Sequence, residues 1–288
     1  MRLQNVNNTN PNTLFKEVVH AIVGNPYNGI ETIKTGLKSP LRYPGGKSRA
    51  VKELMQYFPV GLDTVCSPFL GGGSIELELV SKGVEVFAYD SFEPLTDFWQ
   101  VLLSNPKELA EMVRRYHPLT NSKFYSLQKE YLKIKSKKER AAVFFVLNRA
   151  SFSGTTLSGG MSPDHPRFTN AIIEYLENFE IEKLHVVHAD FHTSLAEHKT
   201  DFLYLDPPYA IDEKLYGTKG SKHTDFDHTG LAKILKKRDG WILSYNDSEE
   251  VRNWYKGHQI LTPKWAYGMS SDKKSRELLI LSKDFFQV

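Results

Sequence analysis

The chain has 288 residues, of which 40% are hydrophobic and 25% are charged, as in an ordinary globular protein. Its formal net charge of +3 is too small to indicate nucleic-acid binding by itself. The single cysteine, Cys66, excludes an intrachain disulfide and a thiolate metal cluster. No apolar run is long enough for a membrane span, and the N-terminus lacks the sections of a signal peptide, so we expect a cytoplasmic protein without a metal.

The first segment with chemical content is Tyr43–Lys47, which reads Tyr-Pro-Gly-Gly-Lys. It follows an N-terminal extension, residues 1–38, whose Asn-rich residues 1–12 we expect to be poorly ordered. Pro-Gly-Gly favours a tight turn, and two glycines beside a lysine let the backbone and the ammonium approach an anionic ligand. A plain turn before a helix would explain the segment equally well.

Next comes a pattern typical of a nucleotide-binding domain. Thr64–Ser67 predicts a strand, Pro68–Ser74 is a glycine-rich turn, and Ile75–Val80 predicts a helix. A second strand, Val84–Tyr89, ends at Asp90, about 20 residues after the glycines, where an acid binds the ribose hydroxyls of an adenosine cofactor. The glycine spacing matches neither the dinucleotide fingerprint nor the P-loop.

Residues 105–183 differ in character from the rest of the chain. Residues 105–140 look helical and strongly basic, although Lys–Glu pairs on a solvated helical face explain the run Lys135–Arg140 more simply. Residues 144–162 contain two glycine turns, which predict a β-hairpin or an extended loop. Its polar side chains are of the kinds that hydrogen-bond base edges, so we expect DNA contacts from Asn148, Arg149, Ser151, Ser153 and Thr155.

The sheet resumes with a strand over Leu184–Ala189, followed by Asp190 and Phe191. An acid beside an aromatic ring at a strand end could bind the amine and the face of an adenine, or Asp190 could cap a helix. A buried strand over Phe202–Leu205 then runs into Asp206-Pro207-Pro208-Tyr209. Because proline cannot donate to a sheet ladder, the chain leaves the sheet at Asp206, with a carboxylate at the carboxyl end of the strand.

This tetrapeptide suits chemistry at an exocyclic amine of a nucleobase, which is a poor nucleophile because its lone pair is delocalised into the ring. The Asp206 carboxylate and the Pro207 carbonyl can accept hydrogen bonds from its two N–H groups and favour a pyramidal nitrogen. Tyr209 offers a ring on which a base taken out of a duplex can stack.

The remaining pattern completes an open, doubly wound α/β sheet. It predicts a strand over Trp241–Tyr245, a helix over Glu249–Tyr255, and an antiparallel edge formed by Ile260-Leu261 and Glu277–Ser282. Residues 215–223 form a basic loop, in which we expect further DNA contacts from Lys219 and Lys222.

In this order the motifs resemble one family, the Dam-like (D12-class, α-class) N6-adenine DNA methyltransferases that depend on S-adenosylmethionine. The resemblance covers residues 40–282. It implies a Rossmann-like methyltransferase sheet with a terminal antiparallel strand and an inserted, mostly helical target-recognition domain with a hairpin. The implied domains are an N-terminal extension (1–38), a catalytic domain (39–104 and 184–288) and the recognition insert (105–183).

The resemblance also implies roles for individual residues. Asp206, Pro207, Pro208 and Tyr209 would hold a flipped adenine for catalysis. The cofactor would be bound by Tyr43, Lys47, Phe69, Gly71, Gly73, Asp90, Asp190 and Phe191. Two departures matter. The family usually starts near its Tyr-Pro-Gly-Gly-Lys segment, so the resemblance gives no role to the extension before Lys38. In addition, Ser67-Pro68 stands where relatives usually have Glu-Pro, which leaves open what replaces the acid near the methionine amine.

The implied function is site-specific methylation of adenine N6 in a short duplex DNA sequence, with no need for an oligomer and alongside a restriction endonuclease for the same site. The same sheet and tetrapeptide would also serve a methyltransferase of RNA or of a protein amide, and a silent DNA-binding relative is a third alternative. The basic insert favours duplex DNA. Asp90, Asp206 and Tyr209 favour a catalyst, because binding alone would not require them.

Overall fold

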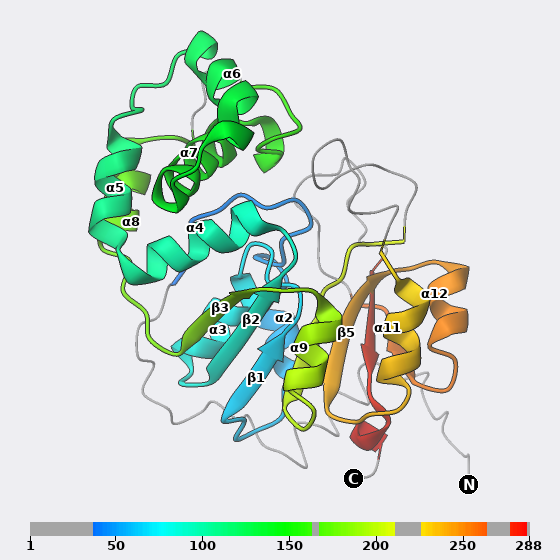
Figure 1. Ribbon diagram of the computed structural model, residues 1–288. Coiled ribbons are helices and arrows are strands. Elements are labelled where there is room, and N and C mark those ends of the chain that lie inside the picture. Colours follow the sequence, from blue (N-terminus) through cyan, green and yellow to red (C-terminus); the bar gives the residue numbers. More distant parts are fainter. Residues whose placement is uncertain (1–36, 163–166, 211–225, 264–276, 287–288) are drawn as a thin grey trace, which may run out of the picture.

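The computed structural model describes residues 37–162, 167–210, 226–263 and 277–286. Within these ranges the chain forms a sheet with helices on both faces and a helical segment beside it (Figure 1). Most of the N-terminal extension and the basic loop with Lys219 and Lys222 lie outside the described residues.

The described strands form one seven-stranded sheet with the order β3-β2-β1-β4-β5-β7-β6. The first five strands in this order are parallel, whereas β7 is antiparallel to both of its neighbours. The predicted α/β class and the antiparallel edge are therefore confirmed. The strands are β1 (Thr64–Ser67), β2 (Glu85–Asp90), β3 (Leu184–His188), β4 (Phe202–Leu205), β5 (Trp241–Asn246), β6 (Gln259–Leu261) and β7 (Glu277–Leu281).

The sheet is buried on both faces, as the side chains of its central strand β4 illustrate. Phe202 and Tyr204 belong to one hydrophobic core, and Leu203 and Leu205 to the other, which is the alternation expected of a strand covered on both sides. The first core includes α2 (Val51–Leu54), α3 (Ser74–Ser81) and α4 (Glu93–Ser104). The second includes α9 (Phe191–Glu197), α11 (His228–Leu235) and α12 (Glu249–Trp254).

The strand order reverses at the centre of the sheet, between β1 and β4. From β1 the chain builds outward through β2 and β3, and from β4 it builds in the opposite direction through β5. The carboxyl ends of β1, β2 and β4 meet at one edge, where Ser67, Asp90 and Asp206 lie. Open α/β sheets bind their ligands at such a reversal point.

The segment between β2 and β3 is helical, as predicted. Of the two structures predicted within residues 144–162, the extended loop fits the described residues better than a regular β-hairpin, because a single antiparallel bridge closes the loop. Helix α7 continues to Ala150 and is followed by a short 3-10 turn over Phe152–Gly154, with an isolated bridge between Ser151 and Met161. The apolar run before Ala150 belongs to a buried helix. The sequence did not reveal this, because a short apolar run is typical of a strand and of a buried helix alike. The described helices here are α5 (Pro106–Arg114), α6 (Asn121–Glu130), α7 (Lys137–Ala150) and α8 (Asn170–Glu177).

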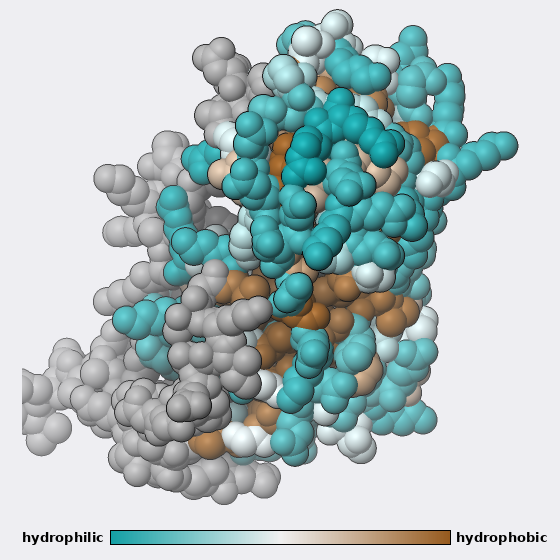
Figure 2. Space-filling model, turned by 90° about the vertical axis from the view of Figure 1, so that its left-hand side faces the viewer, coloured by the Kyte–Doolittle hydropathy of each residue, from teal (hydrophilic) through white to brown (hydrophobic). Residues whose placement is uncertain are grey.

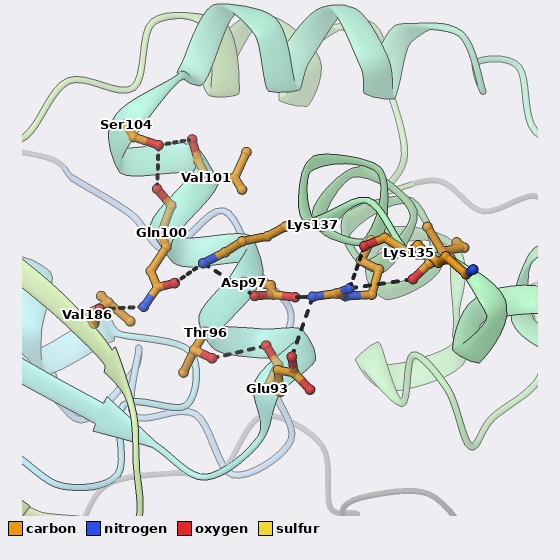
Figure 3. A network of polar contacts seen from close by, with 11 residues as sticks. Glu93, Thr96, Asp97, Gln100, Val101, Ser104, Lys135, Lys137 and Val186 are labelled. Carbon is orange, nitrogen blue, oxygen red and sulfur yellow. Dashed lines mark hydrogen bonds and ion pairs between the residues drawn. The ribbon is translucent and has the colours of Figure 1, made fainter.

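A polar network fastens α7 to α4 (Figure 3). The buried carboxylate of Asp97 accepts hydrogen bonds from Arg140 at 2.5 and 2.9 Å, and Lys137 lies 3.6 Å from the same carboxylate. Lys138 pairs with Glu108 of α5 at 2.6 Å. The basic run therefore pairs with acids, as predicted, but these acids lie on the neighbouring helices α4 and α5 and not on its own helical face.

The helical segment shares its apolar core with the sheet. Side chains of α5, α6, α7 and α8 belong to the same hydrophobic core as α4 and β2. On the face shown in Figure 2, the upper part is mostly hydrophilic, and hydrophobic residues gather across the middle. None of the described helices has the length and apolarity needed to cross a membrane.

Candidate active site

The Tyr43–Lys47 segment forms a tight turn beside the reversal point. The Gly46 N–H donates to the Tyr43 carbonyl at 3.0 Å, and Gly45 has a φ of 74°. With Pro44 in the second position, these features define a type II turn, whose third position favours glycine. The turn directs the Lys47 side chain into the protein, where only 4% of the residue is exposed.

Lys47 links the tetrapeptide, Asp206–Tyr209, to strand β7. Its Nζ donates to both carboxylate oxygens of Asp206, at 2.6 and 2.7 Å, and to the Tyr209 hydroxyl at 2.9 Å. The same ammonium lies 3.4 Å from Glu277 of β7, whose carboxylate also accepts the Tyr209 hydroxyl. The anion that meets this lysine is therefore a carboxylate of the chain itself.

The Lys47 ammonium contacts two carboxylates, those of Asp206 and Glu277, and the buried Glu76 carboxylate lies near enough to be attracted by it. Burial raises the pKa of Glu277 to about 7, and attraction to Lys47 opposes this rise. Burial likewise raises the pKa of Glu76 to about 7 and raises the pKa of Asp206, again against the pull of Lys47. Because negative charges outnumber the ammonium when all three acids are ionised, the cluster favours an additional cation.

The Tyr209 ring is held on two sides. It stacks on Tyr245 of β5 with ring centroids 6.2 Å apart, and the Lys47 ammonium lies 5.2 Å from its centroid. Pro207 is buried, while Pro208 and Tyr209 are half-buried, and all three line a cavity together with Asp206.

The glycine-rich turn after β1 forms another wall of this cavity. A Cβ at Gly73 would lie 2.9 Å from the Trp99 ring, and one at Gly71 would lie 3.1 Å from the Tyr43 ring. Both glycines also have positive φ, which L side chains rarely adopt. Asp90 orders this turn, because its carboxylate accepts the N–H groups of Gly71 at 3.1 Å and Phe92 at 2.9 Å.

Asp190 is the N-cap of α9, so this alternative is confirmed. Its Oδ1 accepts both the N–H and the hydroxyl of Thr193 at 2.9 Å. These hydrogen bonds, with the backbone N–H the largest contribution, lower the pKa of Asp190. The next residue, Phe191, is buried against Phe69 and Phe226, with ring centroids 6.0 and 5.2 Å away.

All these elements border one cavity of about 510 Å³, a size typical of sites for small-molecule cofactors. Every predicted cofactor-binding and catalytic residue lines it. Among its described lining residues there are five carboxylates and one lysine: Glu76, Asp90, Asp190, Asp206, Asp227 and Lys47. The cavity is therefore acidic. Its lining also includes several of the aromatic rings named above.

The predicted DNA contacts are placed differently. Asn148 is fully buried: its Oδ1 accepts the Arg42 N–H at 2.9 Å, and its Nδ2 donates to the Arg42 carbonyl at 2.7 Å. Ser151 is fully buried as well, and its hydroxyl donates to the Asn148 carbonyl and accepts the Thr156 N–H. Burial and saturation with backbone partners do not fit base contacts, so we correct the expectation for both residues to a structural role.

Arg149 is directed at backbone groups of its own chain. Its guanidinium donates to the carbonyls of Arg167 at 2.8 Å and Pro40 at 3.3 Å. Burial, followed by repulsion from Arg42 and Arg167, lowers its pKa to about 10.

The other two predicted contacts lie in the turn after α7. Ser153 and Thr155 are half-buried there, beside Phe152, which is 64% exposed. Thr155 donates its hydroxyl to the Phe152 carbonyl at 2.8 Å.

Sequence reasoning missed two acids. Glu277 begins the fully buried strand β7, and Glu76 lies in α3 between two buried apolar residues. The available signal was the same in both places: a carboxylate at a position where neighbouring residues predict burial.

Comparisons with known proteins agree with this geometry. The family model for the D12 class N6 adenine-specific DNA methyltransferases matches residues 43–269. The type II methyltransferase M1.LlaDCHI of Lactococcus lactis subsp. cremoris is 25% identical over 278 residues, which cover 90% of this chain and 89% of the relative. The DNA adenine methylase of Haemophilus influenzae is 21% identical, with 82% and 89% covered. The type II methyltransferase M.FokI of Planomicrobium okeanokoites is 23% identical, covering 83% of this chain and 41% of the relative.

Proposed function

Because the chain belongs to the D12 class of N6 adenine-specific DNA methyltransferases, we propose that it methylates adenine N6 at one short duplex DNA sequence, with S-adenosylmethionine as donor. The observation that carries this proposal is that Asp206, Tyr209 and Lys47 line one cavity with the Asp90 turn. Glu277 supports this group from β7 through its contacts with Lys47 and Tyr209.

The cavity residues fit this cofactor. Both oxygens of Asp90 accept backbone N–H groups, and a carboxylate oxygen can accept more than one hydrogen bond, as contacts to ribose hydroxyls would require. Phe69, Phe191 and Phe226 pack against one another in the cavity wall and offer an aromatic surface for an adenine ring. The excess of carboxylates suits a ligand with cationic groups. When bound, the cofactor supplies an electrophilic methyl group.

Lys47 keeps the catalytic carboxylate in its acceptor form. Burial raises the pKa of Asp206 and so favours the protonated carboxyl, which is a weaker hydrogen-bond acceptor than the carboxylate. The lysine ammonium offsets this effect and also positions the Tyr209 hydroxyl. The target amine would therefore donate to an ionised Asp206, while its base stacks on the Tyr209 ring.

We assign target recognition to residues 105–183. Ser153 and Thr155 remain the candidates for base contacts, because they lie in the turn with exposed Phe152. Two of the compared relatives are named type II methyltransferases, which supports a role beside a restriction endonuclease for the same site.

The test is transfer of labelled methyl groups from S-adenosylmethionine to unmethylated duplex DNA, followed by identification of the modified nucleoside. We expect N6-methyladenine at one sequence, and RNA of that sequence as a non-substrate. Asp206→Ala should lower the rate by about 10²–10³ or more while cofactor affinity stays within several-fold. Transfer to RNA alone, or a fully active variant, would contradict the proposal.

A further inference from the structure

Glu76 is a buried acid in the cavity wall that the chemistry above does not use. It lies in the first turn of α3, is only 2% exposed and borders the cavity. Its Oε1 accepts the hydroxyl of Ser67, the last residue of β1, at 2.5 Å. The hydrogen bond fixes the carboxylate over the carboxyl end of β1.

This position lies between the two ends of the site. In the sheet β1 stands between β2, which ends at Asp90, and β4, which leads into Asp206. Ser67 pairs with Ala88, two residues before Asp90, and Cys66 pairs with Leu203, three residues before Asp206. A ligand with its ribose at Asp90 and its methyl group near Asp206 must therefore pass the end of β1.

We propose that the Glu76 carboxylate binds the ammonium group of the cofactor's methionine moiety, and that Ser67 positions this carboxylate. The inference rests on the proposed cofactor. The choice of the ammonium follows from hydrogen bonding: an ammonium carries three N–H donors for a carboxylate, whereas the sulfonium carries none. A buried carboxylate with one hydroxyl partner retains acceptor capacity for such a group.

The electrostatics of the cavity support this assignment. Ser67 from β1, Tyr204 and Asp206 from the β4 region, and Lys47 from the turn all act on or face Glu76. Burial is the largest influence and raises the pKa of Glu76 to about 7. A bound ammonium would lower this pKa, so the acid would lose its proton on binding near neutral pH.

Calorimetry with three ligands tests the proposal without turnover. S-adenosylmethionine and S-adenosylhomocysteine carry the ammonium, whereas 5′-methylthioadenosine lacks the amino acid end. At pH 8, Glu76→Gln should weaken both ammonium ligands by about 10-fold to 150-fold and leave methylthioadenosine within about two-fold. Glu78→Gln is the matched control on the same helix, because Glu78 is partly exposed and pairs with Lys82. It should change none of the three affinities.

A double variant that moves the carboxylate from position 76 to position 67 provides a second test. Because the Ser67 hydroxyl touches the Glu76 carboxylate, Ser67→Glu combined with Glu76→Ser returns a carboxylate to nearly the same place. This double variant should recover most of the S-adenosylhomocysteine affinity that Glu76→Ser loses. In the wild type, binding of this ligand at pH 7 should release protons and tighten as the pH rises through about 7. Both effects should vanish in Glu76→Gln.

The outcomes separate this inference from the proposed function. If the wild type binds none of the three ligands, the proposed cofactor fails. If the wild type binds them and Glu76→Gln weakens none, or weakens all three equally, the ammonium contact is refuted. A loss confined to S-adenosylmethionine would also refute it, because only that ligand carries the sulfonium.

Discussion

Replacing Asn148 by alanine should destabilise the protein without changing its choice of DNA sequence. The side chain pairs with both the N–H and the carbonyl of Arg42, and it also donates to Gly154 and Thr156. Loss of the amide leaves two backbone groups without their partner, at about 1–3 kcal/mol each. Since Arg42 is half-buried and water can reach it in part, we expect about 2–4 kcal/mol, the lower part of the summed range.

Urea unfolding followed by tryptophan fluorescence measures this loss. Asn178→Ala is the control, because Asn178 is exposed and donates only within its own helix end, to Glu174; it should stay within about 0.5 kcal/mol of the wild type. The same variants are then assayed for methylation of the preferred site against its single-base variants. If Asn148→Ala keeps wild-type stability but loses about 1–3 kcal/mol of discrimination at one base pair, the structural role is wrong and Asn148 contacts a base.

Three further predictions concern single residues. Asp90→Ala should weaken S-adenosylhomocysteine by about 10-fold to 150-fold in calorimetry with little effect on DNA binding, and unchanged affinity would leave Asp90 as a turn-ordering residue only. Glu277 has a raised pKa of about 7 when folded, so its contribution to stability is present below about pH 4.5 and lost as the pH rises through 7. Denaturant titrations should therefore show that the free energy of unfolding of Glu277→Gln, relative to that of the wild type, rises by on the order of 3 kcal/mol between pH 5 and pH 8. Parallel pH profiles of the two free energies would contradict the raised pKa. Arg149→Ala should lower stability and leave base discrimination unchanged in the variant-site assay, because the guanidinium holds two backbone carbonyls; relaxed choice at one base would overturn that assignment.

Much of the sheet and of the site could be predicted because the signals are local. The strands before Ser67, Asp90 and Asp206 are short apolar runs that end in polar or turn-forming residues. Parallel strands bring such ends to one edge, so side chains far apart in sequence could be expected in one cavity.

The errors arose where a side chain's partner lies far away in sequence. Asn148 looks like a base-contacting residue by type, and only the fold shows that its partner is the backbone of Arg42, 106 positions earlier. Glu277 lies 68 positions after Tyr209. The apolar residues of its strand predict the strand but give no role to the acid at its start. Residue type and spacing predict chemistry near a strand end, but they do not identify which distant group satisfies a polar side chain.

The contacts around Arg42 connect the helical segment to the turn that carries Lys47. Asn148 holds Arg42 by both backbone groups, and Gly154 packs so closely that a Cβ there would lie 2.0 Å from the Arg42 carbonyl oxygen. Tyr175 of α8 holds Lys38 in the same way, accepting its N–H and donating to its carbonyl. Lys47 follows Arg42 by only five residues and lies directly after the tight turn that begins at Tyr43. The helical segment therefore supports the backbone from which the Lys47 turn begins, and this support lies on the opposite side of that turn from Asp206 in sequence order.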